Sequence, residues 1–160
     1  PPFLATVALF VDPSADEVRR VVDVTRPDLL QFHGDEDPGF CAGFGVPYIK
    51  AVKIGAAPPE PGVLGYHALA RGLLLDTHDP AAAGGTGRTF DWSLAPRGSA
   101  RPIILAGGLN ALNVAQAIRQ VRPYAVDVSS GVEAAPGIKD AARVREFMRA
   151  VAVVNAAVRD

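Results

Sequence analysis

The sequence has one cysteine, three histidines and almost no excess of either charge. A single cysteine excludes an internal disulfide framework. Sixteen Lys and Arg stand against 17 Asp and Glu, without a run of like charges, so nothing favours nucleic acid or an anionic membrane as a partner. No stretch has the basic flank and apolar core of a signal peptide, nor the length of a membrane span. These absences favour a small-molecule partner and a reducing, cytoplasmic setting.

Apolar residues make up 49% of the 160 residues, which is enough to bury one sizeable core. We expect a single domain over residues 1–160, because no linker, long-period repeat or low-complexity segment marks a second one. The chain opens on "PPFLATVALFVD", with almost no lead-in before an apolar strand. A domain that starts so abruptly is expected to be incomplete at its N-terminus.

Apolar strands alternate with helical segments along the whole chain. The pattern predicts strands at 4–11, 29–34, 48–54, 72–76, 102–108 and 124–131, and helices beginning near residues 14, 37, 64, 111 and 139. The first helix is capped by Asp12 or Ser14. Strands that are apolar throughout, each followed by a helix, indicate an α/β protein with a parallel sheet. An open doubly wound sheet and part of a (β/α)8 TIM barrel both satisfy this order.

The last two predicted helices show the clearest apolar faces. The first of them has an apolar residue at Val114, Ala117, Ile118 and Val121, and the second at Val144, Phe147, Met148, Val151 and Ala152. This spacing is typical of a helix that packs on a sheet.

The apolar run "LLLD" ends in a carboxylate, Asp76. A strand buried on both faces has no solvent side for a charge, so Asp76 is expected at the carboxyl end, where α/β proteins bind their ligands. Asp127 in "YAVDVSSG" repeats the pattern. Two converging carboxylates could act as acid and as polar anchor, although each could instead satisfy backbone amides. Asp76 is the stronger catalytic candidate.

Two consecutive strands end in loops that suit a phosphate. "LAGGLN" carries Gly107 and Gly108, and "VSSGVE" carries Ser130 and Gly131. Backbone amides of such loops, ahead of helix N-termini, bind anions, and TIM barrels frequently bind phosphate after their last two strands. Any one of these glycines could be only a turn residue. Two such loops in succession favour a phosphate site.

A long loop of small residues, "DPAAAGGTGRTFDW", follows shortly after Asp76. Its glycines, Gly85 among them, suit a lid that approaches the ligand and excludes water; the alternative is a disordered surface loop. The loop lacks the lysine and the spacing of a Walker motif, so a nucleotide triphosphate is not indicated.

His33 follows "LLQF", with Gln31 two residues back on the same face of the strand. It could donate to a substrate, although a lone histidine is more often structural. No second ligand lies nearby at convincing spacing, so we expect no metal site. Cys41 is expected to act as a small apolar residue, since no charged partner is evident to lower its pKa. Lys50 and Lys53 lie in the third predicted strand and could reach the mouth or an inner layer of a barrel, but exposure to solvent is the simpler expectation.

Five segments, "LLQFHG", "LLLDT", "GGTGRTFDW", "LAGGLN" and "VDVSSGVEAAPGIKD", closely resemble, in this order, the phosphoribosylanthranilate isomerases of tryptophan biosynthesis. The resemblance runs over nearly the whole chain. It implies a (β/α)8 barrel and an Amadori rearrangement of N-(5-phosphoribosyl)anthranilate to 1-(2-carboxyphenylamino)-1-deoxyribulose 5-phosphate, without a cofactor. It also implies that Asp76 is the general acid and that the two glycine loops hold the phosphate, with Asp127 near the sugar hydroxyls.

One departure from the family pattern concerns the general base. In the family it is a cysteine in a "KICG"-like motif on the first strand, and no such motif occurs in the 160 residues. Aligned on the other motifs, the chain covers about strand 3 to helix 8, without the first two βα units. The alternatives are another phosphosugar isomerase or epimerase barrel, and a catalytically silent fragment that binds phosphate. Both a monomer and a homodimer are compatible with the sequence.

Overall fold

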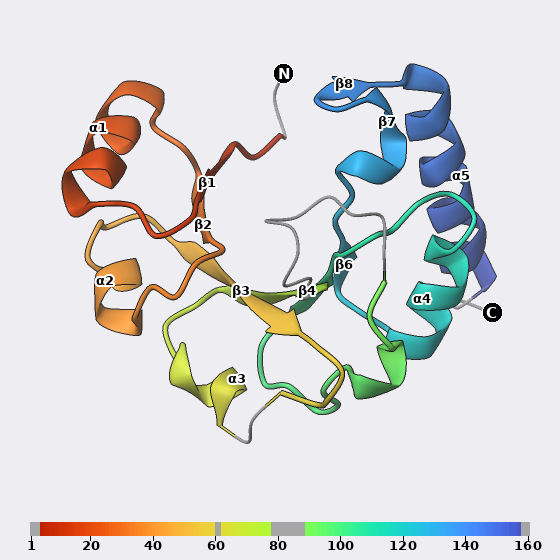
Figure 1. The fold of residues 1–160 in the computed structure, drawn as a ribbon, viewed down its shortest axis with the longest axis horizontal. Coiled ribbons are helices and arrows are strands. Elements are labelled where there is room, and N and C mark those ends of the chain that lie inside the picture. Colours follow the sequence, from red (N-terminus) through yellow and green to blue (C-terminus); the bar gives the residue numbers. More distant parts are fainter. Residues whose placement is uncertain (1–3, 60–61, 78–88, 158–160) are drawn as a thin grey trace. The chain divides into compact units, whose positions relative to one another are not determined.

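The computed structural model describes residues 4–59, 62–77 and 89–157 (Figure 1). Six strands form one sheet whose order follows the sequence: β1 (Val7–Phe10), β2 (Leu29–Phe32), β3 (Tyr48–Ile54), β4 (Gly72–Thr77), β5 (Ile103–Leu105) and β6 (Ala125–Val126). Strands β1, β2 and β3 pair in parallel, and so do β5 and β6. The predicted α/β class with a parallel sheet is confirmed, although the first and last strands are shorter than the apolar runs that predict them.

The chain divides into two compact units, each assembled from several segments. The first unit contains Pro1–Val52, Glu60–Leu74 and Ser99–Pro102, and the second contains Lys53–Pro59, Leu75–Gly98 and Ile103–Asp160. The divisions fall inside β3 and β4, so each of these strands contributes residues to both units.

In the first unit, α1 (Ala15–Thr25) begins at Ser14, whose Oγ accepts a hydrogen bond from the Glu17 N–H at 3.2 Å. Asp12, the alternative cap, lies instead in the preceding turn with a φ of 47°. A short polar residue tolerates this left-handed backbone because its side chain can bond nearby amides. Here Asp12 Oδ1 accepts from the Asp35 N–H at 2.6 Å. The cap of α1 is therefore Ser14.

The core of the first unit is aromatic. Phe32, the last residue of β2, is fully buried, and its ring centroid lies 5.8 Å from that of Phe10 and 6.0 Å from that of Tyr48. Two rings from α2 (Pro38–Ala42) and the turn after it, Phe40 and Phe44, lie 6.0 and 6.3 Å from Phe32. Aromatic pairs at such distances contribute roughly 0.5–1.5 kcal/mol each beyond burial. The cluster fixes the carboxyl end of β2 and the start of the loop that follows it.

Helix α3 (Val63–Tyr66) is a single turn, shorter than the helix predicted to begin near residue 64. Gly62, with a φ of 99°, precedes it and Gly65 lies within it, and glycine is a poor helix former. A tertiary contact holds the segment instead. The Arg101 guanidinium donates to the carbonyls of Leu64 at 3.2 Å and of Ala68 at 2.7 Å.

The second unit contains a hairpin that the sequence pattern did not predict. The helical elements of the second unit are η1 (Trp92–Leu94), α4 (Val114–Val121), η2 (Ser130–Val132) and α5 (Ala141–Ala157). Between η2 and α5, β7 (Glu133–Ala135) pairs antiparallel with β8 (Ile138–Lys139). Asp140 then starts α5, because its Oδ1 accepts from the N–H groups of Ala142 at 2.7 Å and Arg143 at 3.1 Å.

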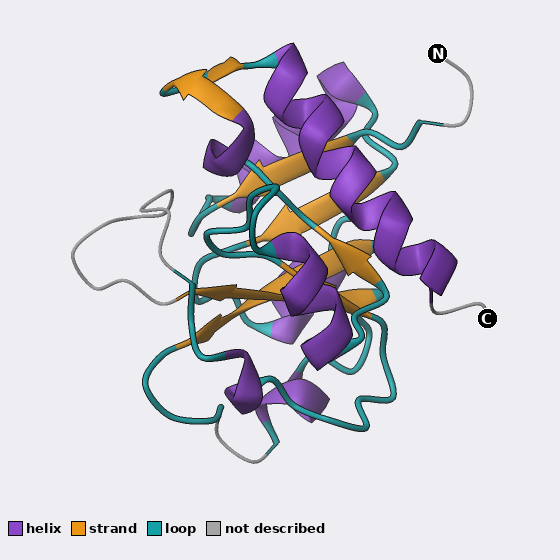
Figure 2. Cartoon of the chain, turned by 90° about the vertical axis from the view of Figure 1, so that its right-hand side faces the viewer, coloured by secondary structure: helices purple, strands orange, loops and turns teal. Residues whose placement is uncertain are grey.

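Helices α4 and α5 pack against each other, as Figure 1 and Figure 2 both show. The predicted apolar face of α4 is confirmed, since Val114 and Ala117 are fully buried. On α5 the buried side chains are Phe147 and Val154, while Met148 of the predicted face is 59% exposed. The predicted face of α5 was therefore wrong in part.

Apolar side chains are exposed along one face of β1. Val7 and Leu9 of the strand, and Val11 directly after it, lie at every second position and are 47%, 56% and 61% exposed. Burial of such side chains is the main driving force of folding, so a row of them in contact with solvent is unusual. Among the described strands of the sheet, β1 neighbours only β2, and it therefore forms an edge.

Candidate active site

Asp76 ends a buried strand, as the sequence predicts. Leu73, Leu74 and Leu75 of β4 are fully buried, whereas Asp76 at the carboxyl end is half-buried. Its Oδ1 accepts a hydrogen bond from the Thr77 N–H at 2.8 Å. This short local bond fixes the orientation of the carboxyl group in the second unit.

Gly107 brings the first predicted phosphate loop directly against this carboxylate. A Cβ added to Gly107 would lie 2.3 Å from Thr77 Oγ1 and 2.9 Å from Asp76 Oδ1, so no side chain fits. The φ of Gly107 is 79°, a left-handed conformation that also favours glycine. Gly108 follows with a φ of 63°. The loop after β5 therefore touches the end of β4 through its backbone.

A side chain that the sequence reasoning missed holds this loop in place. Asn113 donates from Nδ2 to the Gly108 carbonyl at 3.0 Å, and its Oδ1 accepts from the Asn110 N–H at 2.8 Å. Asn113 is also the N-cap residue of α4. The signal was present in "GLNALN", since asparagine is frequent in turns and at helix starts. Asn113 thus ties the glycine loop to a helix N-terminus, which favours anions.

The second predicted phosphate loop meets the first at Gly131. A Cβ at Gly131 would lie 1.8 Å from the Leu109 carbonyl oxygen and 3.2 Å from Asn110 Cα. The two loops therefore touch backbone to backbone. Ser130 opens η2 at this point. The structure thus brings the loop of Gly107 and Gly108 into contact with the loop of Ser130 and Gly131. The role of these four residues in phosphate binding stays a prediction.

Asp127 follows β6 directly, and its N–H donates to the Leu105 carbonyl at 2.8 Å. Asp127 is exposed, whereas Asp76 is half-buried. Its position near a strand end is as expected. Its role near the sugar hydroxyls stays a prediction.

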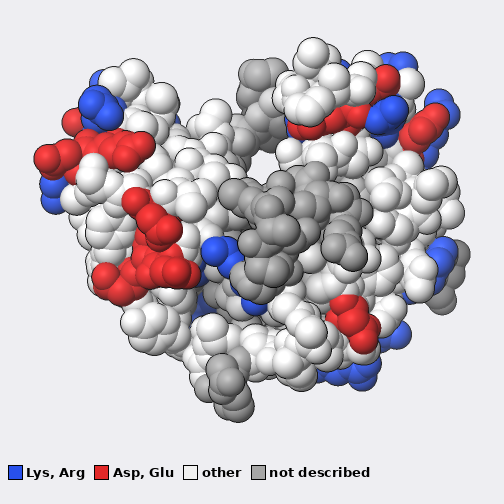
Figure 3. Space-filling model, in the orientation of Figure 1, with Lys and Arg blue, Asp and Glu red and all other residues white. Residues whose placement is uncertain are grey.

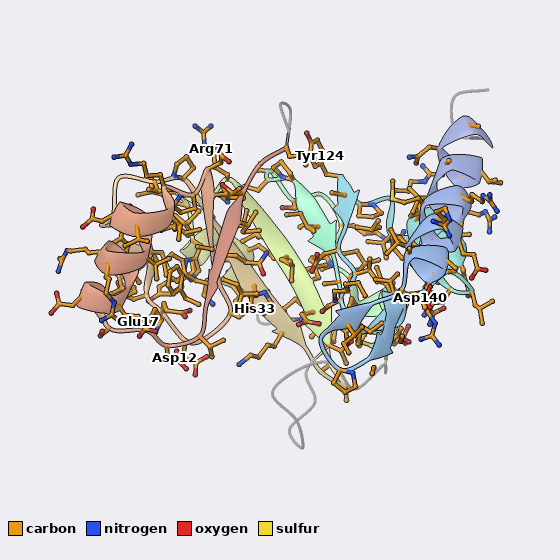
Figure 4. All side chains as sticks on the ribbon, turned by 90° about the horizontal axis from the view of Figure 1, so that it is seen from above. Asp12, Glu17, His33, Arg71, Tyr124 and Asp140 are labelled. Atoms are coloured by element: carbon orange, nitrogen blue, oxygen red, sulfur yellow. The ribbon has the colours of Figure 1, made fainter. Side chains whose placement is uncertain are left out.

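His33 lies at the carboxyl end of β2, in the first unit. Its Nε2 lies 2.5 Å from Gln31 Oε1, which confirms that the two side chains share one face of the strand. Figure 4 shows His33 and Asp12 at the same end of β1 and β2, with Arg71 at the opposite end. A role of His33 in substrate binding stays a prediction.

Lys50 is not exposed, which contradicts the sequence prediction. It is 5% exposed, and its Nζ lies 3.3 Å from Glu36 Oε2. Nζ also donates to the carbonyls of Gly34 at 2.6 Å and Phe32 at 3.3 Å. The prediction rested on the usual exposure of lysine and did not include an acidic partner. A buried lysine is tolerated where the fold places a carboxylate beside it, as Glu36 is here. Lys53 is exposed, as predicted.

The other oxygen of Glu36 joins the loops that follow β1 and β2. Glu36 Oε1 accepts from the Asp12 N–H at 2.9 Å and from the Gly34 N–H at 3.1 Å. Gly34 is also in close contact with Asp12, because a Cβ there would lie 2.0 Å from Asp12 Oδ1. The Lys50–Glu36 pair is therefore the buried centre of this loop cluster.

Cys41 is fully buried on α2, as expected of a small apolar residue. Burial, with the charge of Glu36 as a second cause, raises the pKa of the Cys41 thiol to about 12. A thiol with this pKa is protonated at neutral pH, so Cys41 supplies neither a nucleophile nor a base.

Gly85 and most of the predicted lid lie outside the described residues. Within the described residues, no group of three or more His, Cys, Asp or Glu is arranged to hold a metal ion. None of the helices in this part of the chain is both long and apolar enough to cross a membrane.

Residues 2–150 match the family described as "N-(5'phosphoribosyl)anthranilate (PRA) isomerase". The chain belongs to this family. The PRA isomerase of Pseudomonas putida is 56% identical over 151 residues, a match that covers 94% of this chain and 73% of the relative. The PRA isomerase of Stutzerimonas stutzeri is 52% identical, with the same coverage.

Solved PRA isomerase structures share the fold. The enzyme of Thermus thermophilus superposes with a TM-score of 0.84 at 34% identity, over 96% of this chain and 75% of its own. That of Thermotoga maritima gives 0.81 at 39% identity, over 94% and 74%. A PRA isomerase in complex with reduced 1-(o-carboxyphenylamino)-1-deoxyribulose 5-phosphate gives 0.75 at 35% identity, over 93% and 72%. The chain thus has the barrel-like α/β fold of PRA isomerases.

Proposed function

We propose that this chain supplies the general acid and the phosphate site for the Amadori rearrangement of N-(5'-phosphoribosyl)anthranilate, in a single-domain cytoplasmic enzyme of tryptophan biosynthesis. The observation that carries the proposal is the contact of Gly107 with Asp76 and Thr77, which joins the candidate acid to the candidate phosphate loop. The substrate requires both functions, because its phosphate must be bound while its ribose ring is opened. Both lie within the second unit.

Asp76 is the general acid in this reaction. It gives a proton to the ribose ring oxygen, the bond from C1 to that oxygen breaks, and the anthranilate nitrogen lone pair forms the C1=N bond of a Schiff base. The hydrogen bond from the Thr77 N–H to Asp76 Oδ1 holds the carboxyl group in place for this transfer.

The second step removes the proton at C2 and gives an enolamine. This becomes the C2 ketone of the product when C1 takes up a proton and the C2 hydroxyl loses one. None of the 160 residues is assigned as the base for this step. Cys41, the only cysteine, is fully buried and has its pKa raised to about 12. The base that the family places in a "KICG"-like motif has no matching motif in the sequence.

Backbone amides of the two glycine loops bind the substrate phosphate in this proposal. Gly107 and Gly108 supply one side, Ser130 and Gly131 the other, and the contact of Gly131 with the Leu109 carbonyl supports a shared anion site. Three further residues are proposed to contact substrate, namely Asp127, His33 and Gly85.

We assign β1 to β6 to strands 3 to 8 of an eight-stranded barrel. The order of the motifs supports this register, and so does the coverage of 73% of the Pseudomonas putida relative. The exposed apolar face of β1 is a second support, because strands of closed barrels are covered on both sides. The assembly is a monomer or a homodimer.

Replacement of Asp76 by Asn tests the proposal. The amide keeps the shape of the side chain but cannot deliver a proton as an acid, so turnover should fall at least about 10²-fold. Turnover is followed by the loss of substrate fluorescence, and binding of the reduced product analogue should be unchanged. Asp23→Asn, on the exposed side of α1, is the matched control.

The outcomes separate the isomerase from its alternatives. Full turnover by Asp76→Asn would remove the acid role. A wild-type chain that binds the analogue without any turnover would be a silent phosphate-binding scaffold. Turnover of a different phosphosugar in place of the anthranilate substrate would indicate another isomerase or epimerase.

A further inference from the structure

The hairpin of β7 and β8 returns Lys139 to the loop that follows β6. Lys139 Nζ donates to the Ser129 carbonyl oxygen at 3.0 Å and to Ser129 Oγ at 3.1 Å. It also lies 2.6 Å from Glu133 Oε1, on the paired strand. The lysine therefore holds the residue immediately before Ser130 and Gly131.

The carbonyl of Ser129 sets the direction of the next N–H group. A trans peptide is planar, so this C=O and the N–H of Ser130 point in opposite directions; no cis peptide occurs among the described residues. Ser129 has a φ of −119° and a ψ of −86°, values of neither helix nor strand, so no regular ladder holds its peptide. Apart from Lys139, the carbonyl accepts a longer bond from the Val132 N–H at 3.3 Å. Lys139 thus turns the Ser130 N–H away from the hairpin.

Glu133 in turn fixes Lys139. Its Oε2 accepts from the Gly137 N–H at 3.2 Å across the hairpin turn, and its carbonyl accepts from the Arg143 guanidinium. The Glu133 side chain is 14% exposed, against 49% for Lys139. The hydrogen bond from Lys139 is the main cause that lowers the pKa of the Glu133 carboxyl, so this carboxyl stays ionised at neutral pH. Figure 3 shows charges of both signs over the hairpin and the start of α5.

We propose that Lys139 and Glu133 are positioning residues for the phosphate of the substrate. Glu133 holds Lys139, Lys139 holds the Ser129 peptide, and the oriented N–H of Ser130 binds the anion. Lys139 does not bind the phosphate itself, because an ammonium has three N–H donors and all three have oxygen partners here. This inference rests on the proposed function, since it concerns the same phosphate site.

The test measures phosphate binding and turnover in Lys139→Met and Glu133→Gln. We expect the Kd of inorganic phosphate and of the reduced product analogue to rise about 10-fold in both variants, because each releases the Ser129 peptide. KM should rise in parallel while kcat stays nearly unchanged, since the effect is on anchoring and not on Asp76. Lys139→Arg keeps the charge and several donors and should restore part of the affinity. Arg149→Met, exposed on α5, is the matched control for a lost positive charge.

The sign of the Glu133→Gln effect decides between positioning and direct contact. If Lys139 bound the phosphate directly, removal of the neighbouring carboxylate would tighten binding, and tighter binding would overturn the proposal. An unchanged Kd in both variants would overturn it as well. If thermal melting shows that Lys139→Met does not fold, the Glu133→Gln result alone decides. A wild-type chain that binds neither phosphate nor the analogue would reject the proposed function itself.

Discussion

Replacement of Gly131 by alanine is expected to separate the two loops that are predicted to bind phosphate. The new Cβ would lie 1.8 Å from the carbonyl oxygen of Leu109 and 2.9 Å from its carbonyl carbon. Both are backbone atoms, so the methyl group fits only if a loop moves. Ordinary van der Waals contact begins at 3.4 Å, so the oxygen must retreat by about 1.6 Å.

A displacement of this size should be visible in both stability and binding. Overpacking of a tight contact costs about 1–3 kcal/mol of folding free energy. A misplacement of about 1 Å in a binding site can cost about 10²-fold in rate. We therefore expect kcat/KM to fall about 10²-fold, with a weaker Kd for the reduced product analogue.

Calorimetric titration with the analogue and urea unfolding measure the two effects separately. Gly65→Ala is the matched control, because a Cβ at Gly65 meets no atom within 4 Å and its backbone needs no positive φ. That control should leave binding unchanged. An unaltered Kd and kcat/KM in Gly131→Ala would refute the close contact of the two loops.

Two further predictions concern the first unit. Lys50→Met should lower the free energy of unfolding by about 3–5 kcal/mol in urea melts, because it leaves the buried Glu36 charge without its partner; a loss below about 1 kcal/mol would contradict burial of the pair. Stability should also fall as the pH rises from 9.0 toward 12, since the pKa of Cys41 in the folded chain is raised to about 12 and the unfolded thiol loses its proton first. Cys41→Ala should remove this part of the slope, and Cys41→Ser should leave turnover nearly unchanged.

The sequence predicted the elements whose signal is local. The apolar run before Asp76 predicted a strand buried on both faces with a carboxylate at its end, because a strand of this kind is apolar at every consecutive position. The same reasoning located Gly107 and Gly131 in loops after strands. It also identified Cys41 as a buried apolar residue.

The contacts between distant segments were not predictable in this way. Lys50 forms an ion pair with Glu36, and the residues next to Lys50 in its strand do not indicate that a carboxylate lies beside its ammonium group. The collision of a Cβ at Gly131 with the Leu109 carbonyl likewise depends on two loops 22 residues apart in the sequence. The surroundings of Lys50 and Gly131 are set by packing between remote segments, and the pattern of a single sequence does not show which remote segments lie close in space.

The hairpin of β7 and β8 was missed for a different reason. Its strands have three and two residues, too few for an alternating pattern to stand out. The Pro136–Gly137 pair between them is a turn signal, and Gly137 has a φ of 76°. Attention to that dipeptide would have separated β8 from the helix that begins at Ala141.

The division of the chain between two units restricts how the protein can be dissected genetically. The first unit combines segments as far apart as Pro1–Val52 and Ser99–Pro102, so no continuous stretch of the gene encodes one unit alone. A deletion boundary placed at Val52 or Leu74 would cut β3 or β4 and remove residues from the cores of both units. Point substitutions such as Asp76→Asn and Glu133→Gln are the changes that can attribute catalysis and phosphate binding to separate residues.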